Sequence, residues 1–139
     1  MTSKNIAKQF YIMSIEKINL SEKLSQFSDY FNPRIVGELN GQQACQPWLV
    51  KLVKFQGEFV WHHHDNEDEL FYVVKGSFDM HLPDKIITIN AGEFLIMPRG
   101  VEHKPVAKEE VEIMLFEPAS TVNTGNVENE LTRKELKYL

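Results

Sequence analysis

The stretch WHHHDNEDE, residues 61–69, decides most of what this sequence indicates about fold and function. On a β-strand, side chains two residues apart point to the same face, so His62 and His64 project together and His63 points away. Glu69 follows an acidic stretch that can turn the chain, and it opens an apolar strand from which its carboxylate can face the same cavity. Two histidines and one carboxylate bind divalent transition metals and leave coordination positions open.

A second stretch, GEFLIMPRGVEH at residues 92–103, delivers a further histidine. A glycine, a short apolar strand and a Pro-Arg-Gly turn place His103 at the start of the next strand. Taken alone, a short histidine-rich tract in an acidic loop is also typical of a solvated segment that binds metals adventitiously. The residues by themselves leave open whether His103 reaches the cavity.

Both stretches lie within a segment that has a β-rich pattern. From residue 34 to residue 118, short runs of Val, Ile, Phe and Tyr are divided by Gly, Pro, Asn and Asp. This pattern predicts an antiparallel β-sandwich or barrel. We expect its strands at residues 34–39, 48–56, 60–64, 70–75, 78–82, 85–89, 94–97, 103–107 and 111–116.

The segments on either side of this body have different patterns. Residues 1–33 form an N-terminal extension in which apolar positions at three- to four-residue steps predict a short helix around residues 20–27. Residues 119–139 form a polar tail, whose end is compatible with a short amphipathic helix. Within this tail, Asn and Gly predict an ordered turn over residues 121–125. We therefore expect three parts, namely residues 1–33, a domain at 34–118, and residues 119–139.

The two histidine stretches together resemble the two motifs of the cupin superfamily. The first motif is a glycine, a His-x-His pair, a glutamate and a second glycine, matched here by Gly57, His62, His64, Glu69 and Gly76. The second is a glycine, a Pro-x-Gly turn and a histidine, matched by Gly92, Pro98, Gly100 and His103. Two positions depart from the pattern: Gly57 lies one residue closer to the His-x-His pair than usual, and Ala107 replaces an Asn that often closes the second motif.

The resemblance, which covers roughly residues 48–118, implies an all-β, jelly-roll barrel of a small single-domain cupin. It also implies that His62, His64, Glu69 and His103 bind one divalent transition metal per chain, such as Fe, Mn, Ni, Cu or Zn. Three histidines and one glutamate would leave about two sites of an octahedral ion for water, dioxygen or a chelating molecule.

The composition excludes several other classes of protein. The chain has 139 residues, 42% hydrophobic and 25% charged, with a net charge of −5, which is typical of one soluble globular domain. This charge argues against nucleic-acid binding, and residues 1–33 lack the basic recognition helix of a transcription factor. The apolar runs are too short for a membrane helix. Cys45 is the single cysteine, so no disulfide forms within the chain, and we expect a cytoplasmic protein.

Two functions remain open for a cupin of this kind. The first is a mononuclear metalloenzyme that acts on a small organic substrate. Beyond the four expected ligands no general base is evident, which favours oxygenase-like chemistry over isomerisation. The alternative is a non-catalytic cupin that binds or senses a small molecule through its metal and pocket. The strand at residues 70–74 is apolar on both faces, so we expect a partner subunit or the N-terminal helix to cover its outer face. The outer face of residues 111–116 carries Met114 and Phe116 beside Glu112, which also indicates partial burial, and we therefore expect a homodimer.

Other side chains are open to a structural and a functional interpretation. Five apolar side chains, which are Phe71, Val73, Phe78, Met80 and Leu82, are expected to point inward, either to line the cavity or to fill the core. Arg99 is either a solvated charge in a turn or a group that meets an anionic substrate.

Overall fold

The computed structural model describes residues 15–40 and 47–139 of the chain. Cys45 lies outside the described residues. One short helix, α1 (Leu20–Leu24), precedes eight strands. The strands are β1 (Arg34–Leu39), β2 (Trp48–Glu58), β3 (Glu69–Lys75), β4 (Ser77–His81), β5 (Ile86–Asn90), β6 (Phe94–Met97), β7 (Lys104–Pro118) and β8 (Lys137–Tyr138). The fold is the all-β jelly roll expected from the sequence, and no helix in the described part is long and apolar enough to cross a membrane.

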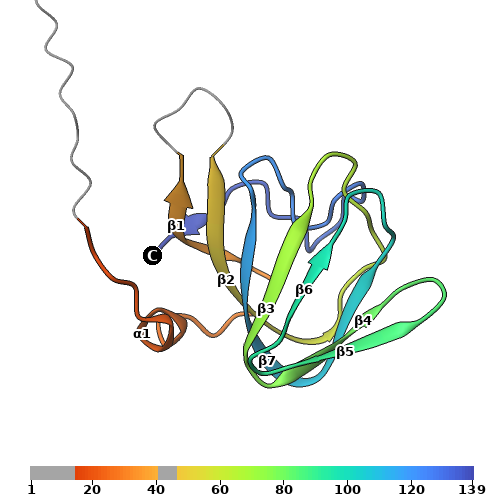
Figure 1. Cartoon of the computed structure of the whole chain (residues 1–139), viewed down its shortest axis with the longest axis horizontal. Coiled ribbons are helices and arrows are strands. Elements are labelled where there is room, and N and C mark those ends of the chain that lie inside the picture. Colours follow the sequence, from red (N-terminus) through yellow and green to blue (C-terminus); the bar gives the residue numbers. More distant parts are fainter. Residues whose placement is uncertain (1–14, 41–46) are drawn as a thin grey trace, which may run out of the picture.

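The longest strand, β7, organises the sheet (Figure 1). One edge of β7 pairs antiparallel with β2 along most of its length. Its other edge pairs with β4 near its start and with β3 near its end, and β3 in turn pairs with β6. Because one strand joins both halves of the sheet, the segments that carry the two histidine motifs come close together in space.

The main core fills the space enclosed by β2, β3, β4 and β7. Alternate residues of these strands point inward, as the buried and half-buried positions of β3 and β4 show. Four of the five side chains expected to point inward are buried in this core, namely Phe71, Val73, Phe78 and Met80, and Leu82 packs against it while partly exposed. Burying such side chains contributes about 1.5–3 kcal/mol each.

A second, smaller core lies under helix α1. Leu24 and Phe27 from the N-terminal segment pack with Val36 and Leu52, and Val74 from β3 lies against this cluster. Asn19 caps the helix, because its Oδ1 accepts a hydrogen bond from the backbone N–H of Glu22. The N-terminal segment therefore covers part of the second apolar face of β3, so a partner subunit is not needed at Val74.

Several expected boundaries were wrong in detail. The expected strand at residues 60–64 is absent, and in its place His62 and His103 form an isolated β-bridge. The two strands expected at 103–107 and 111–116 are one continuous strand, β7. The polar run at residues 108–110 indicated a break, but these residues are exposed and solvent accommodates them within the strand. Phe55 of β2 pairs with Val111 and Gly57 pairs with Ala107, so β7 has the extra residues between these two pairs and bulges there.

The C-terminal segment contains no helix, contrary to the expectation from its amphipathic end. Residues 119–136 form successive turns, and the chain ends in β8, which pairs parallel with β1. Asn side chains stabilise this path: Asn123 Nδ2 donates to the Leu131 carbonyl, and Asn129 Oδ1 accepts from the Leu131 N–H. Such bonds compete with helical ones. The turn expected over residues 121–125 is confirmed, with Gly125 at a φ of +56°.

Candidate metal centre

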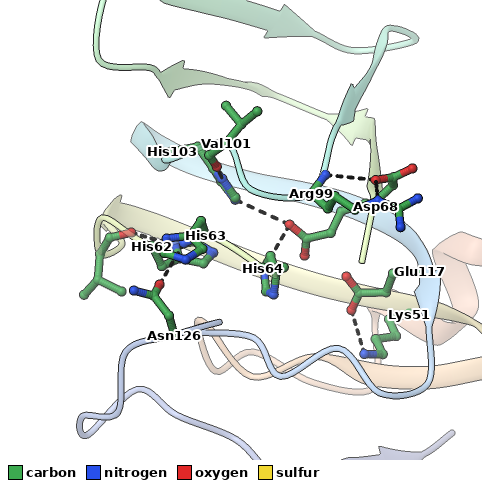
Figure 2. Close-up of polar contacts among 12 residues, drawn as sticks. Lys51, His62, His63, His64, Asp68, Arg99, Val101, His103, Glu117 and Asn126 are labelled. Carbon is green, nitrogen blue, oxygen red and sulfur yellow. Dashed lines mark hydrogen bonds and ion pairs between the residues drawn. The ribbon is translucent and has the colours of Figure 1, made fainter. Parts of the chain in front are cut away.

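Four side chains from three segments of the chain meet inside the barrel (Figure 2). His62 and His64 lie in the segment between β2 and β3, Glu69 is the first residue of β3, and His103 directly precedes β7. One ligand atom from each residue lies within 4.8 Å of every other. All four residues are buried, with exposed fractions of at most 4%. The structure thus brings together the four residues that the sequence predicted.

Backbone carbonyls orient two of these histidines. The Nδ1 of His62 lies 2.8 Å from the carbonyl oxygen of Val60, and the Nδ1 of His103 lies 2.8 Å from that of Val101. Because a carbonyl oxygen only accepts, each Nδ1 must carry the proton and donate it. In the neutral form of each ring, Nε2 then has the lone pair with which an imidazole binds a metal.

Several polar atoms in the cluster have close neighbours but no hydrogen bond. The Oε2 of Glu69 lies 3.1 Å from His64 Nε2 and 3.4 Å from His103 Nε2. Within the described residues, none of these three atoms has a hydrogen-bond partner. Buried polar atoms without partners are costly and rare in folded proteins. A cation among them would satisfy all three, so the residues fit a metal.

The protonation states of the cluster also suit a cation. Burial, and next the neighbouring His103, lowers the pKa of His62 to about 4, so this imidazole is neutral near pH 7. Burial opposes ionisation of Glu69, but the imidazoles of His103 and His64 outweigh it and hold its pKa below the usual range. A neutral imidazole at His62 and an ionised carboxylate at Glu69 can bind a divalent cation without first releasing protons.

His63 faces away from the cluster, as the alternation of side chains predicted. Its Nδ1 lies 2.6 Å from Glu102 Oε1 and its Nε2 lies 3.0 Å from Asp65 Oδ1. The hydrogen bond to Glu102 raises the pKa of His63. His63 is therefore a surface group within a small acidic network, and no sequence spacing identified these partners.

The C-terminal segment holds the backbone between the two ligands His62 and His64. The N–H of His63 donates to Asn126 Oδ1 over 2.9 Å, and the N–H of Asn126 donates to the His63 carbonyl over 3.1 Å. Gly125 lies so close that a Cβ there would overlap the same carbonyl oxygen. The sequence indicated a turn here but gave no sign that it contacts the histidine segment.

A buried ion pair that the sequence patterns did not predict lies beside the cluster. Lys51 of β2 and Glu117 of β7 are each 2% exposed, and Lys51 Nζ lies 2.6 Å from Glu117 Oε1. Burial, and next the charge of Glu69, raises the pKa of Glu117, while Lys51 opposes this shift. A signal was available, because Glu117 continues the inward alternation of Val111, Ile113 and Leu115 by one more step.

A small cavity adjoins the cluster, with a volume of about 50 Å³. His62, Glu69 and Glu117 contribute polar groups to its wall, and the rest is mostly aromatic and aliphatic. These other lining residues are Phe31, Pro33, Val53, Phe55, Phe59, Phe71, Pro105, Ile113, Leu115 and Asn123. Of the five side chains expected to point inward, Phe71 alone lines this cavity. A few polar groups in an apolar wall are typical of a small-molecule site.

Comparison with known proteins agrees with this architecture. The Cupin domain family matches residues 48–117, which is half of the chain. The chain belongs to the cupin family. Its structure is similar to that of a cupin-2 domain containing protein from Shewanella frigidimarina NCIMB 400, with 46% identity and a TM-score of 0.68 over 73% of this chain and 93% of that one.

Two further relatives are more distant or match a shorter segment. Protein NMB1881 from Neisseria meningitidis is 28% identical, with a TM-score of 0.65 over 75% of this chain and its own full length. YdbB of Bacillus subtilis is 39% identical over 56 residues, and the match spans 40% of this chain and half the length of that relative. These relatives support the cupin fold and name no substrate.

The two departures of this cupin from the family pattern face each other across the sheet. Gly57 of β2 is paired in register with Ala107 of β7. Gly57 has a φ of +90° beside the bulge, and Ala107 is buried in the core. Neither belongs to the four-residue cluster, so the unusual spacing leaves its geometry intact.

Arg99 lies on the surface of this cupin. Its side chain is 63% exposed, and its Nε lies 3.3 Å from Asp68 Oδ1. The backbone N–H of Arg99 donates to the same oxygen, as Figure 2 shows. Arg99 is therefore a solvated charge paired with Asp68, and it does not line the cavity.

Proposed function

We propose that this cupin is a mononuclear metalloenzyme acting on a small organic molecule, with one divalent transition metal held by His62, His64, Glu69 and His103. One observation carries this proposal: four buried residues each place a ligand atom within 4.8 Å of the others. In the described part of the chain, His64 Nε2, Glu69 Oε2 and His103 Nε2 have no hydrogen-bond partner. Three imidazoles and a carboxylate suit Fe, Mn, Ni, Cu or Zn.

A bound ion of this kind would supply Lewis acidity or an oxygen-binding position. The chain supplies the rest of the site. Val60 and Val101 fix the tautomers of His62 and His103 through their carbonyl oxygens. The mostly apolar walls surround the cavity with a low dielectric, which would strengthen electrostatic contacts with a bound molecule.

The choice between oxygenase-like chemistry and isomerisation has to be weighed again. The sequence favoured an oxygenase because it offered no general base, but Glu117 places a carboxyl group in the cavity wall. The lack of an acid–base residue therefore no longer counts against isomerisation. Oxygen-dependent chemistry stays the first hypothesis for a redox-active metal, and oxygen consumption tests it directly.

Elemental analysis is the first experiment. The protein is purified without chelator or histidine tag and compared with a His62→Ala, His103→Ala double variant. Near-stoichiometric metal that is lost in the double variant supports the proposal, and redox-active iron directs the next assays to oxygen consumption. If neither protein holds metal, even after reconstitution with each candidate ion, the metalloenzyme proposal is wrong.

The alternative is a cupin that binds a small molecule without converting it. The small cavity supports this alternative, because a volume of about 50 Å³ admits only a small head group. A metal-loaded protein that binds ligands and shows no turnover of candidate substrates, with or without dioxygen, would favour it over the enzyme.

Two expectations from the sequence stay predictions. A homodimer is tested by light scattering of the purified protein over a range of concentrations, with a mass of twice 16.2 kDa expected. The division of the chain at residues 33 and 118 is tested by limited proteolysis, which should cut first outside the central part.

A further inference from the structure

We propose that Glu117 is a ligand-contacting residue of the cavity, and that its Oε2 accepts a hydrogen bond from an O–H or N–H group of a small molecule bound at the metal centre. Lys51 is the positioning residue that holds this carboxylate in place. The proposal rests on the proposed function, since it needs a metal at the four-residue cluster.

The hydrogen-bonding state of Glu117 is the first observation. Its Oε1 accepts a hydrogen bond from Lys51 Nζ at 2.6 Å. Its Oε2 is buried beside the carboxyl group of Glu69 and has no hydrogen-bond partner within the described residues. A buried carboxylate oxygen without a partner is costly, and a native protein keeps one mainly where something else supplies the donor.

The location of Glu117 is the second observation. Glu117 lines the cavity together with His62 and Glu69. In Figure 2, the carboxyl group of Glu117 points toward the cluster, and Lys51 meets it at one oxygen. Oε2 is therefore the carboxyl oxygen of Glu117 that is left for a donor on a molecule in the cavity.

Stability does not account for the pair. Removing two charges from water costs several kcal/mol each, and replacing a buried ion pair by apolar residues is often neutral or stabilising. Lys51 and Glu117 lie among apolar side chains such as Val53 and Leu115. Apolar residues at positions 51 and 117 would therefore extend the core at this point. A role at the cavity wall explains why charged residues stand there instead.

The charges of the site define the class of ligand. Glu69 presents an ionised carboxylate to the cavity beside Glu117, so a ligand carboxylate directed at this part of the wall would be repelled. A hydroxyl or amide N–H beside a metal-binding oxygen fits instead. The apolar remainder of the wall suits a small hydrocarbon or unsaturated group on the same molecule.

Two hydroxamates provide a matched pair of probes. Acetohydroxamic acid chelates metals through two oxygens and keeps an N–H, whereas N-methylacetohydroxamic acid lacks that donor. Binding to the cobalt-reconstituted protein is followed by the visible spectrum of Co(II), and metal content is measured in the same samples. This readout is independent of catalytic turnover.

The variant Glu117→Gln keeps the shape of the side chain. Lys51 can only donate, so the Gln carbonyl oxygen should pair with it and turn the amide N–H toward the cavity. We expect unchanged metal content and binding of acetohydroxamic acid about tenfold to hundredfold weaker than in wild type, which is the loss of one hydrogen bond to a charged group. N-methylacetohydroxamic acid should bind both proteins equally.

The double variant Lys51→Met, Glu117→Leu provides a second test for the case in which Glu117→Gln does not fold. It removes both charges at once, and it should keep the metal and lose the preference for the N–H probe. Equal affinity of wild type and Glu117→Gln for acetohydroxamic acid, or no binding of this probe by the metal-loaded wild type, overturns the role of Glu117 alone. Failure of wild type to bind cobalt overturns the proposed function as well.

Discussion

His62 and His103 face each other as a two-residue antiparallel bridge that joins the two histidine motifs. The N–H of His62 donates to the His103 carbonyl over 3.1 Å, and the N–H of His103 donates to the His62 carbonyl over 2.9 Å. Their imidazole rings lie 4.3 Å apart, centre to centre. The backbone bridge thus fixes the separation of two candidate ligands before any metal binds.

Replacing His62 or His103 with Ala should weaken metal binding by more than about 100-fold, because even the loss of a group that only orients a metal ligand costs about 10–100-fold. Isothermal titration with the metal found by elemental analysis measures this change. The matched control is His63→Ala, which should bind metal nearly as wild type does, since His63 faces Glu102 and Asp65 instead. Loss of metal from His63→Ala would contradict this assignment of ligands.

The metal-free protein should lose stability in mildly acidic solution. The pKa of His62 is about 4 in the folded protein and 6.5 in its unperturbed form, so the unfolded state binds more protons between these values. The free energy of unfolding should therefore fall by roughly 3 kcal/mol as pH decreases through this window, and this term should be constant above it. Urea denaturation measures the change. The variant His62→Gln should lack this part of the pH dependence. If its free energy of unfolding falls with pH as steeply as that of wild type, the prediction is wrong.

Gly125→Ala should destabilise the protein by more than about 2 kcal/mol. The residue has a φ of +56°, and a Cβ there would overlap the carbonyl oxygen of His63. Gly92→Ala is the matched control, because Gly92 has a φ of +85° but a Cβ added to it would meet no atom within 4 Å. The control should cost only the backbone strain, about 1–2 kcal/mol. Thermal unfolding compares the two, and equal losses would argue against the contact with His63.

Asn126→Ala should lower metal affinity by about tenfold, with a smaller effect on the fold. Its side chain accepts the N–H of His63 and so holds the backbone between the two ligands His62 and His64. Asn129→Ala is the control, since Asn129 bonds within the same C-terminal segment and does not touch the histidines. Similar metal affinities for the two variants would show that Asn126 does not hold the backbone of the two ligands in place.

Lys51→Met alone should cost about 3–5 kcal/mol of stability, because it leaves Glu117 buried without its cation. The double variant Lys51→Met, Glu117→Leu should be close to wild type in stability, since it removes both charges together. Chemical denaturation of the two variants provides the measurement. A double variant as unstable as the single one would mean that the pair stabilises the fold.

The sequence predicted the four residues of the cluster because strand alternation and family spacing are local properties. His62 and His64 stand two residues apart, and the structure places both in the cluster although the segment is no regular strand. Only the resemblance indicated that His103 joins them. The strand break expected after residue 107 was wrong, because exposed polar residues signal a turn and a solvated strand equally well.

Contacts between distant segments could not be predicted from local patterns. Lys51 and Glu117 meet because β2 and β7 pair in register, and the charge of each residue alone indicates an exposed position. Asn126 reaches His63 from the C-terminal segment through a path of turns that no periodicity describes.

The sequence by itself therefore determined the β-rich fold, the family and the four candidate ligands, since each depends on the spacing of nearby residues. Only the tertiary structure decided that Glu117 lies in the cavity wall, that Lys51 pairs with it, and that the C-terminal segment forms hydrogen bonds with the backbone of His63. The physical reason is that burial and hydrogen bonding between remote segments depend on strand register and chain path, which local patterns do not encode.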